Sequence, residues 1–406
     1  GFRFLSISHE LNPAIHLLPR SETTVANAYL SPIIQQFNDS ISRHIPPNQF
    51  YFISSAGQLI PANEFNAKDS LLSGPAGGIK GAEFLGKKYG IRKLITFDMG
   101  GTSTDTARID DKADIRFNLN LGDINLSTPA YYMETVAAGG GSIIDFDEGR
   151  FKVGPSSAGA EPGPACYGKM GPLTLTDINL LQGKLIPEAF SIPIDANASE
   201  LKFTEILAKA GLKASKANRK KVLDGIESIA NEIMAAAIRK ISFSKGFDPS
   251  AYSLLSFGGA GGLHACALAN MLHVKKIIIP FDAGIFSAMG ISRTAREQMP
   301  IRQINELLEA CEQKLPKWFD SLRSIAQKKF TYSGIPIKKT KLTSRHIYLR
   351  YKGQDQVIEM DWSPQIDLKQ KFKEKYFQIY QTEFDFHIEV EKILLNLQAD
   401  QNNDHE

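Results

Sequence analysis

The sequence predicts an α/β protein with a covered central sheet, followed by a smaller α+β region at the C-terminal end. Two apolar runs are each followed by a glycine turn, in "LITFDMGGTSTDTARI" (residues 94–109) and "LLSFGGAGGLHACALA" (residues 254–269). A continuous apolar run is typical of a strand in a sheet that is covered on both faces. After about Arg296 the pattern changes to charged segments and alternating strands, which indicates the smaller region.

The chain has 406 residues, which is too long for one ordinary hydrophobic core. We therefore expect three segments, 1–75, 76–296 and 297–406. Because the chain begins at Gly1 and "RFLSIS" (residues 3–8) already reads as a strand, we expect a fragment or a processed product.

Composition narrows the class of protein. Hydrophobic residues make up 43% and charged residues 22%, as in globular proteins, and the net charge of +3 gives no reason to expect a nucleic-acid or membrane partner. The three cysteines show no CxxC spacing, which argues against a disulfide framework or a zinc site and favours a reducing compartment. No apolar run is long enough to span a bilayer and no charged leader opens the chain. These features predict a cytoplasmic protein.

In the first segment, a helix is expected from the hydroxyl cap Ser21, with Val25, Ala28, Ile33 and Phe37 on its apolar face. A strand is expected in "QFYFISS" (residues 49–55). The next helix begins near Pro75 and ends at Gly90.

In the second segment, strands flank the first glycine turn, and "ADIRFNLN" (residues 113–120) is expected as a third strand of the same sheet. Residues 139–183 are rich in glycine and proline, and we expect a packed loop region with a hairpin in "SIIDFD" and "RFKVG". A long helix is predicted over 221–245, ended by Gly246, and "VKKIIIP" (residues 274–280) is expected as a buried strand.

In the third segment, we predict a charged helix over 302–329. Strands are expected around "RHIYLRY" (residues 345–351) and "QVIEMDW" (residues 356–362), followed by a helix near 366–383.

The two glycine turns are either tight structural turns or loops that hold phosphates. Glycine lets the backbone approach a ligand closely, and successive N–H groups form an anion site to which hydroxyls such as Thr102 and Thr104 add donors. Asp98, at the end of a strand, would hold Mg²⁺ through water or orient an attacking water. Neither turn matches the GxxxxGK[ST] or GxGxxG phosphate motifs.

Four other side chains have both a functional and a structural interpretation. His264 would touch substrate or metal, or be a helix-start histidine satisfied by its neighbours. Asp177 would be a metal ligand or a helix cap. Glu134 would face a cleft or be a solvated side chain, and Cys166 would be reactive or a buried structural thiol.

Five motifs together resemble the hydantoinase/oxoprolinase family, over about residues 6–293. They are "LLSGPAGGIKGAEFLGKKYG" leading into the first glycine turn, "AAGGGSI", "VGPSSAGAEPGPACYG", "LTLTDINLLQGKL" and "FGGAGGLHACALA". Their order and spacing make the set specific. The resemblance implies an actin-like ATPase fold, with two ribonuclease-H-like lobes around a nucleotide.

The resemblance also implies site residues and chemistry. Together with the residue types discussed above, it makes Asp98, Asp105 and His264 the candidate catalytic residues and Asp98 and Asp177 the candidate Mg²⁺ ligands. The nucleotide, ATP, would be bound by the two turns: Gly100, Gly101, Thr102, Ser103, Thr104, Gly258, Gly259, Ala260, Gly261 and Gly262. The family opens small cyclic amides with ATP, and the amide oxygen would be phosphorylated. A second, B-type subunit and an oligomeric assembly are expected.

Two alternatives stay open. No "DxGGTFTD"-type loop precedes Ser73, so the first lobe is expected to be incomplete in this chain. A truncated or degenerate relative would act as a non-catalytic structural partner. A subunit of the acetone carboxylase type would use ATP on a ketone rather than on a cyclic amide.

Overall fold

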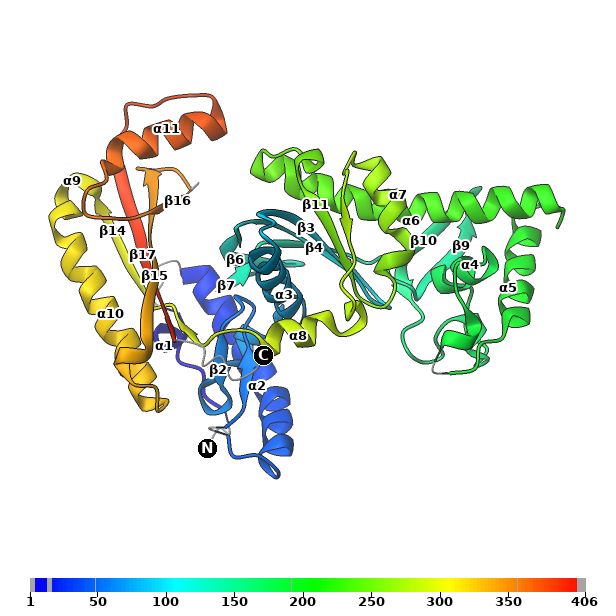
Figure 1. Ribbon diagram of the computed structural model, residues 1–406, viewed down its shortest axis with the longest axis horizontal. Helices are drawn as coiled ribbons and strands as arrows, with labels where there is room; N and C mark the ends of the chain where they lie inside the picture. The colour runs from blue at the N-terminus through cyan, green and yellow to red at the C-terminus, as the bar shows by residue number, and fades with distance from the viewer. Residues whose placement is uncertain (1–3, 13–16, 48, 191, 356, 400–406) are drawn as a thin grey trace. The chain divides into compact units, whose positions relative to one another are not determined.

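The computed structural model describes residues 4–12, 17–47, 49–190, 192–355 and 357–399. Contacts within the chain define two compact units, each built from separate stretches of sequence (Figure 1). Unit 1 comprises Gly1–Ser73, Arg116–Ala130 and Thr294–Glu406, and unit 2 comprises Gly74–Ile115 and Tyr131–Arg293. The three-segment division stays a prediction. No pattern in the sequence indicated that residues 116–130 associate with unit 1.

Unit 2 contains a mixed sheet in the order β12-β11-β3-β4-β5, with β8 also paired to β4. β11 runs parallel to both β12 and β3, whereas β4 is antiparallel to β3, β5 and β8. The strands are β3 (Lys93–Met99), β4 (Thr104–Asp110), β5 (Lys112–Ala113), β8 (Met133–Val136), β11 (Ser253–Phe257) and β12 (Ile277–Ile278). The strands predicted around the first glycine turn and before the second are confirmed.

Six helices and one hairpin complete the regular structure described for unit 2, apart from short 3-10 turns. They are α3 (Ser73–Tyr89), the hairpin β9 (Ser142–Asp147) and β10 (Arg150–Ser157), α4 (Leu175–Leu181), α5 (Ala196–Lys209), α6 (Lys216–Lys245), α7 (Gly261–Met271) and α8 (Phe286–Ser292). The predicted hairpin is confirmed, as is the helix that ends before Gly90. "VKKIIIP" is wrong as a buried strand, because β12 is a two-residue edge strand and Ile279 is 55% exposed.

The long helix α6 forms because apolar residues recur along one face. The residues of this face are buried or half-buried: Val222, Ile226, Ile229, Ile233, Ala237 and Ile241. The helix begins earlier than predicted, where the Ser215 hydroxyl accepts from Asn218 N, and ends at the left-handed Gly246. Alternate residues of β3 serve the two faces of the sheet. Phe97 packs in the core with α6 and α7, whereas Thr96 and Asp98 lie beside Ile79 of α3.

The C-terminal part of unit 1 is an antiparallel sheet in the order β13-β17-β15-β16, with β14 also paired to β17. Its elements are β13 (Glu297–Gln298), β14 (Ile301–Leu307), α9 (Leu308–Cys311), α10 (Leu315–Tyr332), β15 (Thr340–Tyr351), β16 (Ile358–Asp361), α11 (Leu368–Tyr380) and β17 (Ile388–Ala399). β15, β16 and α11 confirm the prediction. The helix predicted over 302–329 is wrong in its first part, because residues 301–307 pair with β17.

The N-terminal part of unit 1 holds two helices and two hairpins. They are α1 (Ser8–Leu11), α2 (Leu17–Ser42), β1 (Tyr51–Ile53) with β2 (Leu59–Pro61), and β6 (Ile115–Leu121) with β7 (Ile124–Tyr131). β1 confirms the strand predicted in residues 49–55. "ADIRFNLN" is wrong as a third strand of the main sheet, because β6 pairs with β7. The strand predicted over 3–8 is also wrong: residue 3 lies outside the described residues, and residues 4–8 form no strand.

The helix α2 contradicts the predicted orientation of its faces. Ser21 lies inside the helix rather than at its cap, and Val25, Ile33 and Phe37 are exposed. Its buried side chains are Thr23 and Asn27. Their oxygens accept the backbone N–H groups of Ser127 and Lys68, so hydrogen bonding to neighbouring backbone decided the buried face.

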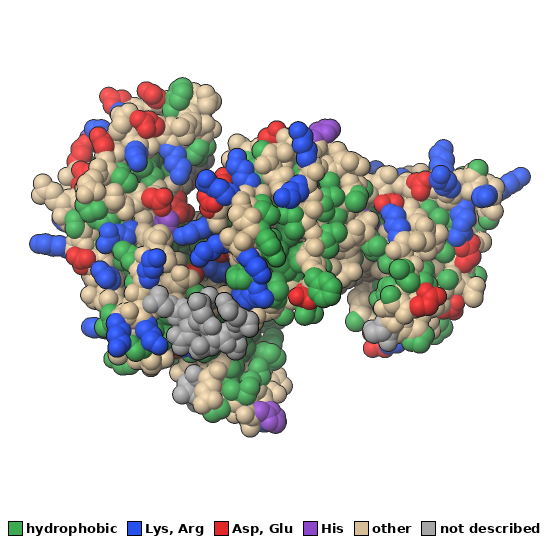
Figure 2. Space-filling model, viewed as in Figure 1, with side chains coloured by type: hydrophobic (Ala, Val, Ile, Leu, Met, Phe, Trp, Pro, Cys, Tyr) green, Lys and Arg blue, Asp and Glu red, His purple; other side chains and the backbone are tan. Residues whose placement is uncertain are grey.

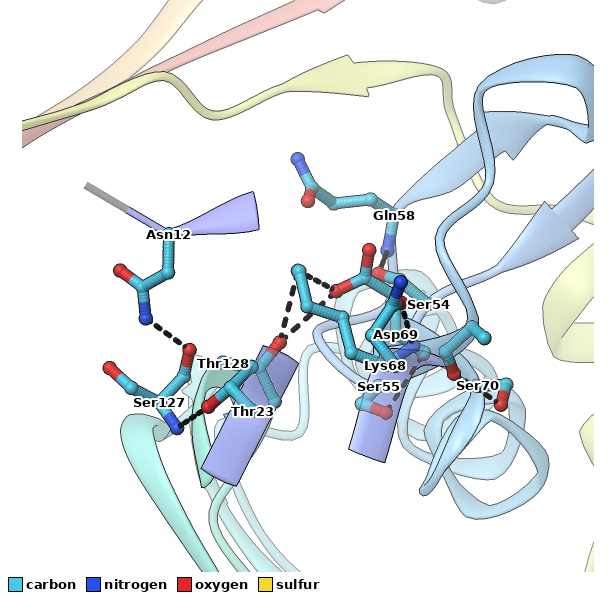
Figure 3. A network of polar contacts seen from close by, with 12 residues as sticks. Asn12, Thr23, Ser54, Ser55, Gln58, Lys68, Asp69, Ser70, Ser127 and Thr128 are labelled. Carbon is cyan, nitrogen blue, oxygen red and sulfur yellow. Dashed lines mark hydrogen bonds and ion pairs between the residues drawn. The ribbon is translucent and has the colours of Figure 1, made fainter. Parts of the chain in front are cut away.

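A buried polar network joins the pieces of the N-terminal part (Figure 3). Lys68 Nζ lies 2.6 Å from Asp69 Oδ1 and 3.4 Å from Thr128 Oγ1, and Thr128 Oγ1 donates to Asp69 Oδ1 at 3.1 Å. Ser55 Oγ donates to the Asp69 carbonyl oxygen. Asn12 donates to the carbonyl oxygen of Ser127. The network fixes the 3-10 turn Ala67–Ser70 against β7.

The surface of the chain agrees with the scattered charge of the sequence. On the face that Figure 2 shows, Lys and Arg side chains are spread over both units rather than gathered over one element. Among the described residues, no helix combines the length and the apolar character that crossing a membrane requires.

Candidate functional site

The two glycine turns meet at one edge of the sheet in unit 2. β3 and β11 are parallel neighbours, so their carboxyl ends lie at the same edge. Ala260 N donates to the carbonyl oxygen of Met99 at 3.0 Å. Gly258 has φ +82°, and a Cβ on it would lie 2.4 Å from Met99 O and 2.5 Å from Asp98 Oδ1. Only glycine therefore fits at position 258, where the second turn touches the first.

A third glycine segment, residues 139–141, supports the first turn. Gly140 N donates to Gly100 O at 3.0 Å, and Gly141 N donates to Gly101 O at 2.6 Å. A Cβ on Gly139 would lie 2.7 Å from backbone atoms of Gly101 and Thr102. Beyond its place among the family-like motifs, no role was predicted for this segment, although three consecutive glycines are a signal for close backbone contact.

Backbone donors remain available on both turns. Within the described part of the chain, no acceptor is found for the N–H groups of Gly101, Thr102, Ser103, Gly259 and Gly262. The helix α7 begins at Gly261, inside the second turn, and no side chain of the described residues caps it. Free N–H groups at a turn and at a helix N-terminus favour an anion.

The hydroxyls of the first turn are not equivalent. Thr104 is buried and its Oγ1 donates to the carbonyl oxygen of Ala138 at 2.6 Å. Its hydroxyl is therefore committed within the fold, contrary to the expectation that it faces a phosphate. Thr102 is exposed, and its side chain is accessible to a ligand.

Asp98 and Asp105 form an acidic pair beside the first turn. The register of β3 and β4 places them directly opposite each other. Thr135 Oγ1 donates to Asp105 Oδ1 at 2.6 Å, and Ser287 Oγ donates to Asp98 Oδ2 at 3.4 Å. Burial, and next the charge of Asp105, raise the pKa of Asp98 to about 6, and burial also raises the pKa of Asp105.

The pair lines a small cavity of about 10 Å³, together with Thr96, Thr106 and Phe257. That volume is at the lower limit for one water. Carboxylate oxygens with adjoining water are the ligands that Mg²⁺ prefers, so the pair fits this ion. Among the described residues, no group of three or more His, Cys, Asp or Glu side chains is placed to hold a metal.

His264 is buried in the first turn of α7 and fully engaged. Its Nδ1 lies 2.8 Å from Asn231 Oδ1, and its Nε2 lies 3.2 Å from Asn179 Nδ2. An oxygen at one nitrogen and an amide donor at the other assign the neutral ring with the proton on Nδ1. Burial lowers the pKa of His264 to about 4. The structure therefore agrees with the satisfied-histidine alternative and not with direct contact to substrate.

Asp177 forms the capping box of α4 with Thr174, which agrees with the helix-cap alternative. Its carboxylate accepts from the backbone N–H groups of Ala165, Cys166 and Thr174 and from the hydroxyls of Thr174 and Ser199. These donors occupy both oxygens of a buried side chain. The geometry gives no support to the metal role predicted for Asp177.

The surroundings of Cys166 and Glu134 also indicate structural rather than functional roles. Burial, followed by the charge of Asp177, raises the pKa of Cys166 to about 12, which leaves the thiol protonated and unreactive. Glu134 lies 2.8 Å from Lys240 Nζ, and 17% of its side chain is exposed. It is therefore a paired side chain rather than a solvated one.

Comparison with solved structures defines the class of protein first. The crystal structure of ATP-dependent caprolactamase from Pseudomonas jessenii matches 98% of this chain and 60% of its own, with a TM-score of 0.83 and 27% identity. The nucleotide-free structure of acetone carboxylase matches 97% of this chain and 59% of its own, with a TM-score of 0.76 and 22% identity. The chain therefore has the mixed α/β fold of these ATP-dependent enzymes.

Comparison with sequences then defines the family. The profile of the Hydantoinase/oxoprolinase family matches residues 20–297, and the chain belongs to this family. It is 34% identical to 5-oxoprolinase of Saccharomyces cerevisiae, over 98% of this chain and 32% of that protein. It is 35% identical to caprolactamase subunit alpha of Pseudomonas jessenii, over 71% of this chain and 42% of that protein. The chain thus spans about a third of the length of the 5-oxoprolinase.

Proposed function

We propose that this chain carries the ATP-binding part of an enzyme that opens a cyclic amide, such as 5-oxoproline, a hydantoin or a lactam. The contact between the two glycine turns carries the proposal. It brings free N–H groups of Gly101 to Ser103 and of Gly259 and Gly262 to one edge of the sheet, beside Asp98. The caprolactamase and 5-oxoprolinase relatives support ATP and a cyclic amide as the substrates.

In this proposal the lobes have the actin-like arrangement, and the two turns bind different parts of the nucleotide. The backbone of Gly100 to Thr104 cradles phosphate, and Gly258 to Gly262 approach the adenosine. Asp98 and Asp105 would hold Mg²⁺, which supplies positive charge beside the phosphates. The proposal assigns the ion to this pair because their oxygens accept few hydrogen bonds from the protein, unlike those of Asp177.

The chemistry uses ATP because an unstrained amide resists attack by water. The amide oxygen attacks the γ-phosphorus, and the bond from that phosphorus to the bridging oxygen breaks to release ADP. Water then adds to the ring carbon, and the C–N bond breaks as the nitrogen takes a proton. A second water hydrolyses the acyl phosphate that is left. Asp98, whose pKa of about 6 lies below neutral pH, is ionised there and can orient a water.

A second subunit and an oligomeric assembly in a cytoplasmic setting complete the proposal. One relative is itself named a subunit alpha, which supports a multisubunit enzyme. A ketone as substrate is the second candidate, because the chain shares its fold with acetone carboxylase. The cyclic amide stands first because relatives at 34% and 35% identity carry names of that class.

The test is a thermal shift and a turnover assay on the intact protein. ATP with Mg²⁺ is expected to raise Tm, and 5-oxoproline, hydantoin or caprolactam to stimulate ADP release. Asp98→Ala should lose both effects. Asp147→Ala, in an exposed ion pair with Lys152, is the matched control and should keep both.

Three results would count against the proposal in different ways. If millimolar ATP does not shift Tm, the chain does not bind the nucleotide. That result would favour the alternative of a non-catalytic structural partner. Stimulation by acetone and bicarbonate alone would transfer the chain to the ketone class. Normal turnover of the Asp98→Ala variant would show that the acidic pair is not part of the active site.

A further inference from the structure

We propose that the short helix α4 is a bracket that sets the spacing between the two glycine turns, with Thr176 and Asn179 as positioning residues. The inference rests on the proposed function, because the spacing matters for a ligand that touches both turns. It assigns to "LTLTDINLLQ" a role that neither turn can fulfil alone. Each end of the bracket is a set of hydrogen bonds within unit 2.

The Thr176 end of α4 holds the first turn through one intermediate residue. Both the backbone N and the Oγ1 of Thr176 donate to the carbonyl oxygen of Gly140, each at 2.8 Å. Gly140 N in turn donates to Gly100 O at 3.0 Å. A Cβ on Gly140 would lie 2.8 Å from Thr176 Oγ1, so the helix and the glycine segment are in contact. Movement of Thr176 is transmitted to Gly100.

The Asn179 end holds the second turn through His264. Asn179 Nδ2 donates to His264 Nε2, and His264 lies in the first turn of α7, which begins inside the second glycine turn. On the other side of the ring, His264 Nδ1 donates to Asn231 Oδ1 of α6. All three side chains are buried. The start of α7 is therefore fixed to both α4 and α6.

The helix between these two ends is itself rigidly placed. Thr176 and Asn179 are three residues apart, so they are neighbours on one side of a helix, separated by roughly 4.5 Å along the axis. Asp177 lies between them and ties the helix to Thr174, Cys166 and Ser199. The neutral ring of His264 keeps Nε2 as an acceptor, which the contact to Asn179 requires. A displacement at either end therefore shifts the helix as one body.

The experiment compares matched variants at the two ends, measured as ATP–Mg²⁺ affinity of the intact protein well below its Tm. Thr176→Val and Asn179→Ala should each weaken ATP binding about tenfold, and Thr176→Ser should restore it. The double variant should lose little more than either single variant, because either break disconnects the bracket. Thr204→Val and Asn270→Ala remove exposed side chains of the same types on α5 and α7 and should change affinity less than twofold.

Hydrogen exchange supplies a readout that does not depend on the nucleotide. Asn179→Ala should speed exchange of the bonded Gly100 amide in the first turn, although its lost contact is to α7. Thr176→Val should speed exchange of the bonded amides of Gly258, Ala260 and Leu263. These effects at the more distant turn are expected whether or not the wild-type protein binds ATP. Failure to bind ATP would contradict the proposed function but not the bracket. The bracket is overturned if each variant loosens only its nearer turn, or if the two affinity losses simply add.

Discussion

Asp98 and Asp105 face each other across β3 and β4, and a different hydroxyl group donates to each: Ser287 to Asp98, and Thr135 to Asp105. Two carboxylates directly opposite in a sheet repel one another, which destabilises the folded state. In the proposed function, Mg²⁺ held by the two carboxylates would offset this repulsion. The acidic pair therefore lowers stability at a position that the proposed function needs.

Replacing Asp98 should stabilise the protein at neutral pH. The folded state holds the Asp98 proton up to about pH 6, against an ordinary pKa of 3.8, so the free energy of unfolding falls as pH rises from about 4 to 6. Asp98→Asn removes that fall and should gain on the order of 1–3 kcal/mol at pH 7. Denaturant unfolding from pH 4 to 8 measures it. Asp147→Asn, at an exposed carboxyl whose pKa Lys152 lowers, should show no gain, and a less stable Asp98→Asn would refute the prediction.

The contact between the glycine turns should tolerate no side chain at Gly258. Gly258→Ala combines a left-handed backbone with a clash against Met99 O, and we expect a loss of roughly 2–4 kcal/mol. Gly259→Ala is the matched control, because a Cβ there would meet no atom within 4 Å. Chemical denaturation separates the two variants. Equal stabilities would mean that the turns are not in contact.

Asp177 should behave as a structural cap and not as a metal ligand. Asp177→Ala leaves buried donors around it without acceptors, and a loss of about 3 kcal/mol or more is expected. Asp195→Ala removes the exposed cap of α5 and should cost about 1 kcal/mol. A milder Asp177→Asn variant that folds should keep the full Mg²⁺-dependent rise in Tm. Loss of that rise would restore the metal role.

The polar network of Figure 3 should depend on both of its charges. Lys68→Met leaves Asp69 buried without its ammonium partner, and a loss of about 3 kcal/mol is expected. The double variant with Asp69→Asn should recover part of it, because the orphaned charge is gone. Lys152→Met breaks the exposed pair with Asp147 and should leave the stability almost unchanged. A Lys68→Met protein as stable as this control would show that the pair contributes nothing.

The sequence predicted elements whose signal is local. The helix α6 has its apolar residues at helical spacing, and the turns at Gly90 and Gly246 need a left-handed backbone. Those signals do not depend on partners elsewhere in the chain. The first strand and its glycine turn were predictable for the same reason.

Elements decided by distant partners were not predictable. β14 is a strand because β17 pairs with it, and β17 itself was missed. The face that α2 buries is set by the N–H groups of Ser127 and Lys68, which hydrophobic periodicity cannot indicate. At the candidate site, the turns and Asp98 could be predicted from local sequence, whereas the part proposed for Gly140 and Asn179 depends on hydrogen bonds between segments.

The interleaving of the two units bears on how the protein is made. The chain leaves unit 2 after Ile115, contributes residues 116–130 to unit 1, and returns at Tyr131. Unit 1 also needs β17, close to the end of the described chain, to complete its sheet. During translation, unit 2 can close once α8 has left the ribosome, whereas the N-terminal stretch must wait for β17 with its neighbours unmade. The nascent chain is therefore expected to expose unfinished surface until β17 has been made, which makes it a natural client for chaperones.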